Sequence, residues 1–86
     1  MSIPTPIRIY GTEWCTDCHR ARAFFEQRRI PYVWIDPDQE SEAEQFVLRI
    51  NQGLRSVPTI VFPDGSILVE PSVADLIAKF EDLGQT

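Results

Sequence analysis

The sequence predicts an α/β domain in which a four-stranded mixed sheet is flanked by helices. Segments of strand composition alternate with segments of helical periodicity, in the order β-α-β-α-β-β-α. The hairpin-type turn "PDGS" separates β-rich residues 59 to 62 from residues 67 to 70, which should therefore pair antiparallel. No linker, repeat or low-complexity segment interrupts the 86 residues. We therefore expect residues 1–86 to form a single domain.

The first half of the chain predicts a β-α-β unit. Residues 7 to 10, "IRIY", alternate apolar and polar side chains and have strand composition. Good helix formers follow from residue 15 to about residue 29. Residues 31 to 36, "PYVWID", return to strand composition. Strands joined through a helix should be parallel, with a right-handed crossover.

Two helices in the second half carry the same start signal. In "SEAEQFVLRINQG", Ser41 and Glu44 have capping-box spacing, and apolar side chains recur behind them at helical spacing. Ser72 and Asp75 repeat this spacing before the last helix, which Gly84 should end. Six aromatic residues in these periodic segments are expected in the core: Phe24, Phe25, Trp34, Phe46, Phe62 and Phe80.

Composition narrows the classes of partner. The net charge is −5, from 13 acidic and 8 basic side chains, and neither sign forms a long block, so nucleic acid is not an expected partner. No apolar run approaches the ~20 residues of a membrane span. The segment "MSIPTPIRIYG" has neither a basic leader nor a long apolar region. The sequence thus predicts a cytoplasmic protein that does not bind membranes, and we expect a monomer.

The segment "EWCTDCHRARAFF" contains a C-x-x-C-H pattern that fits three chemistries: haem attachment, half of a zinc site, or a thiol-disulfide couple. Haem attachment needs export and a second axial ligand, yet His19 is the only histidine and Met1 the only methionine. A structural zinc site needs four ligands, usually as two pairs, and this chain has one pair. We expect no metal site, although a module that binds metal between two chains or senses redox state stays an alternative.

The thiol-disulfide interpretation needs a stabilised thiolate. Cys15 is placed at the start of the first helix, where unpaired backbone N–H groups and the helix dipole favour a negative sulfur. Cys18, one turn later, can attack a mixed disulfide on Cys15. The sequence therefore predicts that Cys15 is the nucleophile and Cys18 the resolving thiol.

Charged neighbours of the two cysteines act in opposite directions. Arg20, Arg22 and His19 should favour a thiolate on Cys15. Glu13 and Asp17 should oppose it. The sequence does not show which set dominates.

Four segments together resemble the glutaredoxin branch of the thioredoxin fold: "WCTDC" after a strand, "SVPTIVF", "DGS" in a hairpin and "PSVADL" at the last helix. The similarity covers nearly the whole chain, and its details look most like the mycoredoxins of actinobacteria. The resemblance implies an enzyme that reduces mixed disulfides between proteins and a small thiol, mycothiol or glutathione, with no bound cofactor. The main alternative is a dithiol electron donor recharged by a flavin-dependent thioredoxin reductase.

The resemblance also implies where substrate binds. It makes the Val57–Pro58 bond cis and places it beside Cys15, with the Val57 backbone pairing with the bound thiol peptide. Trp14, next to the nucleophile, is expected to form a wall of the partner groove, because tryptophan is enriched at interfaces. Arg55 matches a position that holds the charged ends of the thiol.

Some other positions that match the glutaredoxin family also have a second explanation, and others hold a residue that differs from the one common in relatives. Ser72 and Asp75 also match positions that hold the thiol, but helix capping explains them equally well. Thr12 stands where relatives often have a lysine, Thr16–Asp17 replaces Pro-Tyr, and Glu70–Pro71 replaces Gly-Gly. These differences argue against glutathione itself.

Overall fold

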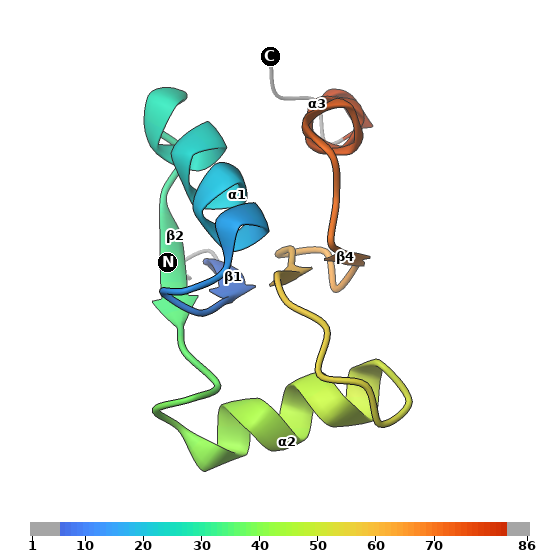
Figure 1. Ribbon diagram of the computed structural model, residues 1–86. Coiled ribbons are helices and arrows are strands. Elements are labelled where there is room, and N and C mark those ends of the chain that lie inside the picture. The colour runs from blue at the N-terminus through green and yellow to red at the C-terminus, as the bar shows by residue number, and fades with distance from the viewer. Residues whose placement is uncertain (1–5, 83–86) are drawn as a thin grey trace, which may run out of the picture.

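The computed structural model describes residues 6–82, and within them a four-stranded sheet lies between helices on both faces (Figure 1). The predicted element order is confirmed. The strands are ordered β2-β1-β3-β4, with β1 parallel to β2 and β3 antiparallel to both β1 and β4. The elements are β1 (Ile7–Tyr10), α1 (Thr16–Gln27), β2 (Tyr32–Ile35), α2 (Ser41–Ile50), β3 (Thr59–Val61), β4 (Ile67–Val69) and α3 (Val73–Asp82).

The two central strands bury side chains on both faces of the sheet. Helices α1 and α3 cover one face and α2 covers the other (Figure 1). Ile9 and Ile60 pack toward α1 and α3, whereas their neighbours Tyr10 and Val61 pack toward α2. Successive side chains of a strand point to opposite faces, so β1 and β3 contribute to two separate hydrophobic cores.

The predicted aromatic core is confirmed at four of its six positions. Phe24, Phe25, Phe62 and Phe80 are buried. Trp34 and Phe46 are only half-buried and pack against the borders of the two cores. Trp34 lies on the edge strand β2, where no further strand covers it.

The two predicted capping boxes have different outcomes. At α3 the box forms, since Ser72 N donates to Asp75 Oδ2 at 2.9 Å and Asp75 N donates to Ser72 Oγ at 3.0 Å. At α2 the prediction is wrong, because Glu40 is the N-cap and Ser41 is already helical. A turn in which Glu40 N bonds to Asp36 O at 3.1 Å leads the chain into the helix one residue early.

The first two helices end slightly before the predicted limits. Arg29 and Gln52, just beyond α1 and α2, adopt positive φ values of 57°, which a continuing helix does not allow. The predicted stop at Gly84 lies outside the described residues. Within residues 6–82, no helix has the length and apolar character needed to cross a bilayer.

Candidate active site

Cys15 is the N-cap residue of α1, with extended backbone at φ −93° and ψ 116°. Its sulfur accepts a hydrogen bond from Cys18 N at 3.2 Å, the bond that a Ser or Asp side chain makes at an ordinary helix start. Cys15 is half-buried and its thiol is free. This sulfur therefore lies at the positive end of the helix dipole, with a backbone N–H donor directed at it.

Cys18 lies one turn along α1 and is fully buried. Burial raises the pKa of its thiol from the ordinary 9.0 to about 12, and the hydrogen bond with Cys15 contributes to the rise. Gly11 lets the loop before α1 pass close to this sulfur: a Cβ there would lie 3.1 Å from Cys18 Sγ and 2.8 Å from Trp34 Cη2. The two thiols therefore differ sharply in access to solvent.

The loop before β3 lies beside the nucleophile. The Val57–Pro58 bond is cis, as the family resemblance implies. The Cys15 thiol faces Val57 O at 3.8 Å. The loop is fixed at its far end, where Thr59 Oγ1 donates to Ser56 O at 2.7 Å. The structure therefore brings Val57 and Pro58 next to Cys15.

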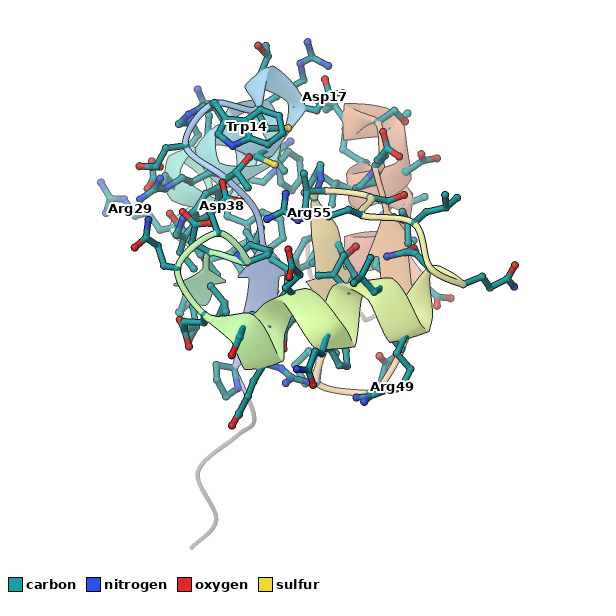
Figure 2. All side chains as sticks on the ribbon, turned by 60° about the horizontal axis from the view of Figure 1, so that its bottom comes forward. Trp14, Asp17, Arg29, Asp38, Arg49 and Arg55 are labelled. Atoms are coloured by element: carbon teal, nitrogen blue, oxygen red, sulfur yellow. The ribbon has the colours of Figure 1, made fainter. Side chains whose placement is uncertain are left out.

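A chain of polar contacts runs from Trp14 through Asp38 and Arg55 to Glu44, and Figure 2 labels the first three of these side chains. Trp14, which is 69% exposed, donates from Nε1 to Asp38 Oδ2 at 2.8 Å. The other Asp38 oxygen pairs with Arg55, whose Nε also bonds to Glu44 Oε2 at 3.1 Å. The Trp14 hydrogen bond and then Arg55 lower the pKa of Asp38. The predicted anion-binding arginine thus already holds two carboxylates.

The charges near the motif pair with one another. Arg20 bonds to Asp17 at 3.1 Å, and Arg22 bonds to Glu13 at 3.2 Å. The favourable and unfavourable charges predicted around Cys15 therefore largely cancel. Such exposed ion pairs contribute little to stability.

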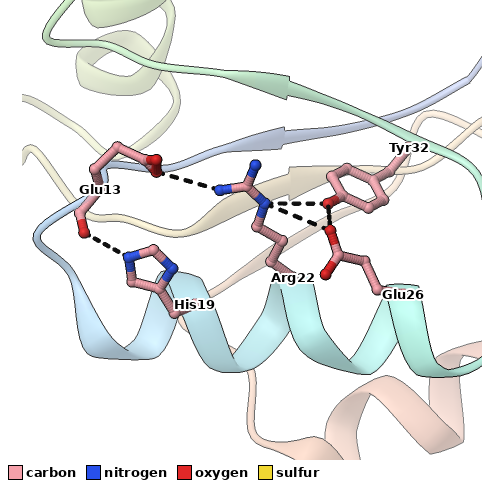
Figure 3. A network of polar contacts seen from close by, with 5 residues as sticks. All are labelled: Glu13, His19, Arg22, Glu26 and Tyr32. Atoms are coloured by element: carbon pink, nitrogen blue, oxygen red, sulfur yellow. Dashed lines mark hydrogen bonds and ion pairs between the residues drawn. The ribbon is translucent and has the colours of Figure 1, made fainter.

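The Glu13–Arg22 pair belongs to a larger network along α1 (Figure 3). The carbonyl of Glu13 contacts the His19 ring, which joins the loop before α1 to the helix. Arg22 Nε donates to Tyr32 Oη at 3.1 Å, and Tyr32 donates to Glu26 at 2.6 Å. His19, which follows Cys18, thus has a structural contact. Across residues 6–82, no group of three His, Cys, Asp or Glu side chains is arranged to hold a metal ion.

Six of the predicted site residues are linked by contacts around Cys15, and the other two bond to each other at the start of α3, shortly after Glu70, whose N–H donates to Pro58 O at 2.8 Å. Ser72 and Asp75 hydrogen-bond to each other at the start of α3, and this contact lowers the pKa of Asp75. Sequence reasoning missed the contacts of Asp38, which carried no signal beyond its charge, and of Glu44, whose spacing from Ser41 predicted a helix cap instead. The linked residues are Trp14, Cys15, Cys18, Arg55, Val57 and Pro58.

Solved structures identify the class of protein. The thioredoxin-like protein BC3987 superposes with a TM-score of 0.73 at 22% identity, covering 84% of this chain and 96% of that one. A buckwheat glutaredoxin in complex with glutathione gives a TM-score of 0.64 at 29% identity, covering 90% of this chain and 69% of that one. The fold is thioredoxin-like, and with the two thiols at the start of α1 it defines a thiol-disulfide oxidoreductase.

Sequence relatives identify the family. The Glutaredoxin family model matches residues 7–67. A Mycobacterium tuberculosis protein assigned to the glutaredoxins is 39% identical over 77 residues, 90% of this chain and 92% of that protein. Mycoredoxin 1 of Corynebacterium glutamicum is 38% identical over 77 residues, 90% of this chain and 95% of that protein. The chain belongs to the glutaredoxin family and is a thiol-disulfide oxidoreductase of glutaredoxin or mycoredoxin type.

Proposed function

We propose that Cys15 attacks disulfide substrates and that Cys18 resolves the product. The contrast between the two sulfurs supports this division: Cys15 is partly exposed at the helix start, and Cys18 is buried one turn behind it. The Cys15 thiolate attacks a substrate sulfur, forms a mixed disulfide and releases the other substrate thiolate, which takes up a proton. Cys18 then loses its proton and attacks Cys15 Sγ, releasing the second thiol and leaving a Cys15–Cys18 disulfide.

We propose that the substrates are proteins carrying a small thiol in disulfide linkage, with mycothiol or glutathione as cosubstrate and no bound cofactor. The similarity to a mycoredoxin and to a glutaredoxin in complex with glutathione supports this substrate class. Because Arg55 is paired with Asp38 and Glu44, it offers little free positive charge to an anionic thiol. This pairing favours mycothiol, a sugar-based thiol, over glutathione.

The residues around Cys15 supply the substrate-binding roles in this proposal. Trp14 lines one side of the bound substrate, and the backbone of Val57 pairs with it beside Pro58. Ser72 and Asp75 cap α3, and a contact between them and the thiol stays a prediction. The chain is expected to act as a monomer in the reducing cytoplasm, where a free pair of thiols persists.

Separate serine substitutions test the two cysteine roles. Cys15→Ser should abolish all activity, because no other thiol can begin the reaction. Cys18→Ser should keep most activity on small-thiol mixed disulfides, since a second small thiol can attack Cys15, and should trap protein disulfides as stable adducts. Mass spectrometry detects the trapped protein adduct. Turnover assays measure the activity of each variant on small-thiol mixed disulfides. Loss of small-thiol activity in both variants would favour the dithiol-donor alternative.

The source of electrons distinguishes the remaining candidates. Oxidised protein is supplied with NADPH and, in turn, a mycothiol, a glutathione or a flavin-dependent thioredoxin reductase system. We expect the mycothiol system to restore free thiols fastest. Faster recovery with thioredoxin reductase would identify a dithiol electron donor, and metal retained after anaerobic purification would support the metal-binding alternative.

A further inference from the structure

The side chain of Thr12, in the loop between β1 and α1, is fully buried, yet its hydroxyl makes no hydrogen bond within the described part of the chain. Buried hydroxyl groups are nearly always paired, because leaving one unpaired is costly. Thr59, the other fully buried threonine of residues 6–82, shows the usual arrangement: its hydroxyl donates to Ser56 O at 2.7 Å. The unpaired hydroxyl of Thr12 therefore calls for an explanation.

The group beside Thr12 is the thiol of Cys18. Both the backbone and the hydroxyl of Thr12 act on this thiol and lower its pKa, although burial and Cys15 outweigh them. Gly11 lies against the same sulfur, since a Cβ there would be 3.1 Å from Cys18 Sγ. The titratable group that faces Cys18 from the described elements is Cys15. Once Cys15 is held in a mixed disulfide and uncharged, the Thr12 hydroxyl is the side-chain donor left beside Cys18.

The resolving step places a negative charge on this buried sulfur. A neutral thiol is a weak hydrogen-bond acceptor, which explains why the hydroxyl is unpaired while Cys18 is reduced. A thiolate is a strong acceptor, and hydrogen bonds to charged groups are roughly twice as strong as neutral ones. A donor that is unpaired in the resting protein but bonded to the attacking sulfur stabilises the transition state selectively.

We propose that Thr12 is a positioning residue whose hydroxyl donates a hydrogen bond to the Cys18 thiolate as Cys18 resolves the mixed disulfide on Cys15. The inference rests on the proposed function, in which Cys18 is the resolving thiol. In this step Cys18 gives up its proton to solvent, its sulfur bonds to Cys15 Sγ, and the bond from Cys15 to the substrate sulfur breaks. The substrate sulfur leaves as a thiolate, so the pair of cysteines is oxidised and the substrate is reduced.

A symmetric aromatic disulfide that releases a coloured thiolate separates the two chemical steps. Attack by Cys15 releases one thiolate in a phase whose rate depends on reagent concentration. Attack by Cys18 releases the second in a unimolecular phase. The reaction is followed in stopped flow with Thr12→Val, which removes the hydroxyl at nearly the same size, and with Thr12→Ser, which keeps it.

We expect Thr12→Val to slow the second phase about tenfold, the loss expected for one hydrogen bond to a charged group. Its pH dependence should also move to higher pH, because the Cys18 thiolate has lost a donor. Thr12→Ser should restore both the rate and the profile. A purely structural role would not move the pH profile, and thermal unfolding of both variants checks the fold.

Two results would overturn the inference. One is a second phase in Thr12→Val with the rate and pH profile of the parent protein. The other is an equal slowing in Thr12→Ser, which would assign the effect to packing of the methyl group. Cys18→Ser tests the proposed function separately from the role of Thr12. Release of the second thiolate in that variant would show that Cys18 is not the resolving thiol.

Discussion

Thr59 shows how strongly a single buried hydroxyl can hold the loop beside the nucleophile. Its hydroxyl donates to Ser56 O at 2.7 Å and lies 3.2 Å from Asn51 Nδ2. Thr59→Val should lower the free energy of unfolding by about 1–3 kcal/mol, because these polar partners would stay buried without Thr59. Denaturant unfolding measures the change.

Thr12→Val is the matched control for Thr59→Val. It makes the same chemical change at an equally buried threonine, but the Thr12 hydroxyl leaves no partner behind. It should therefore cost less unfolding free energy than Thr59→Val. Equal losses in the two variants would show that the methyl-for-hydroxyl exchange itself, and not the hydrogen bonds, sets the cost.

At the residue level, the sequence predicted the contacts that depend on local spacing. Cys15 and Cys18 meet because they lie one turn apart at a helix start. Asp38 could not be predicted in the same way, because its contacts with Trp14 and Arg55 span 24 and 17 residues along the chain. Such contacts depend on how three loops pack together, which the charge of one aspartate does not show.

At the level of elements, the starts of α2 and α3 form a matched pair. Ser72→Ala should lower the free energy of unfolding by about 1 kcal/mol, because Ser72 Oγ accepts the hydrogen bond from Asp75 N. Ser41→Ala should change it little, since Glu40 occupies the cap position of α2. Denaturant unfolding compares the two variants, and equal losses would contradict the cap assignment.

The same two helices show why a start signal is not sufficient. Both have the capping-box spacing, but Glu44 of α2 bonds to Arg55 of the loop before β3. Its carboxylate is therefore engaged away from the helix start. Asp75 has no such competing partner among its described contacts and returns to Ser72 N. Tertiary pairing thus overrode a local pattern in one helix and left it intact in the other.

At the level of the whole molecule, periodicity predicted the architecture because each helix buries one stripe of side chains and the two central strands bury both of their faces. Two-residue alternation in β1 and β3 supplies both cores, and helical stripes cover them. The sequence did not predict how completely each side chain is buried. Trp34 lies on an edge strand and Phe46 at the border of a core, so both stay half-buried despite their periodic positions.

Acid should weaken the fold through carboxylates in two loops and in the first turn of α3. The Ser66 hydroxyl and backbone, with help from Lys79, lower the pKa of Asp64 from 3.8 to about 2, and those of Asp38 and Asp75 are also lowered. A carboxylate with a lowered folded pKa stabilises the protein above its unfolded pKa, and this contribution disappears as the pH falls through the folded value.

Asp64→Asn tests this pH dependence. The parent protein should lose stability between pH ~4 and pH ~2, and Asp64→Asn should lose less over the same range, because it has no Asp64 carboxylate to protonate. Denaturant unfolding at low salt and a series of pH values measures the slope, since salt would screen so exposed a group. Identical slopes would show that the Ser66 and Lys79 contacts do not stabilise the folded protein.

The unequal burial of the two thiols also affects how the protein meets oxidants. Hydrogen peroxide dissolved in the surrounding water reaches Cys15, whereas Cys18 is fully enclosed. Peroxide converts an accessible thiolate to a sulfenic acid, which a neighbouring thiol condenses to a disulfide with loss of water. Without that neighbour, further oxidation to sulfinic acid is irreversible. We therefore expect the enclosed Cys18 to condense with a sulfenic acid on Cys15, giving a disulfide that can be reduced again instead of an irreversibly oxidised thiol.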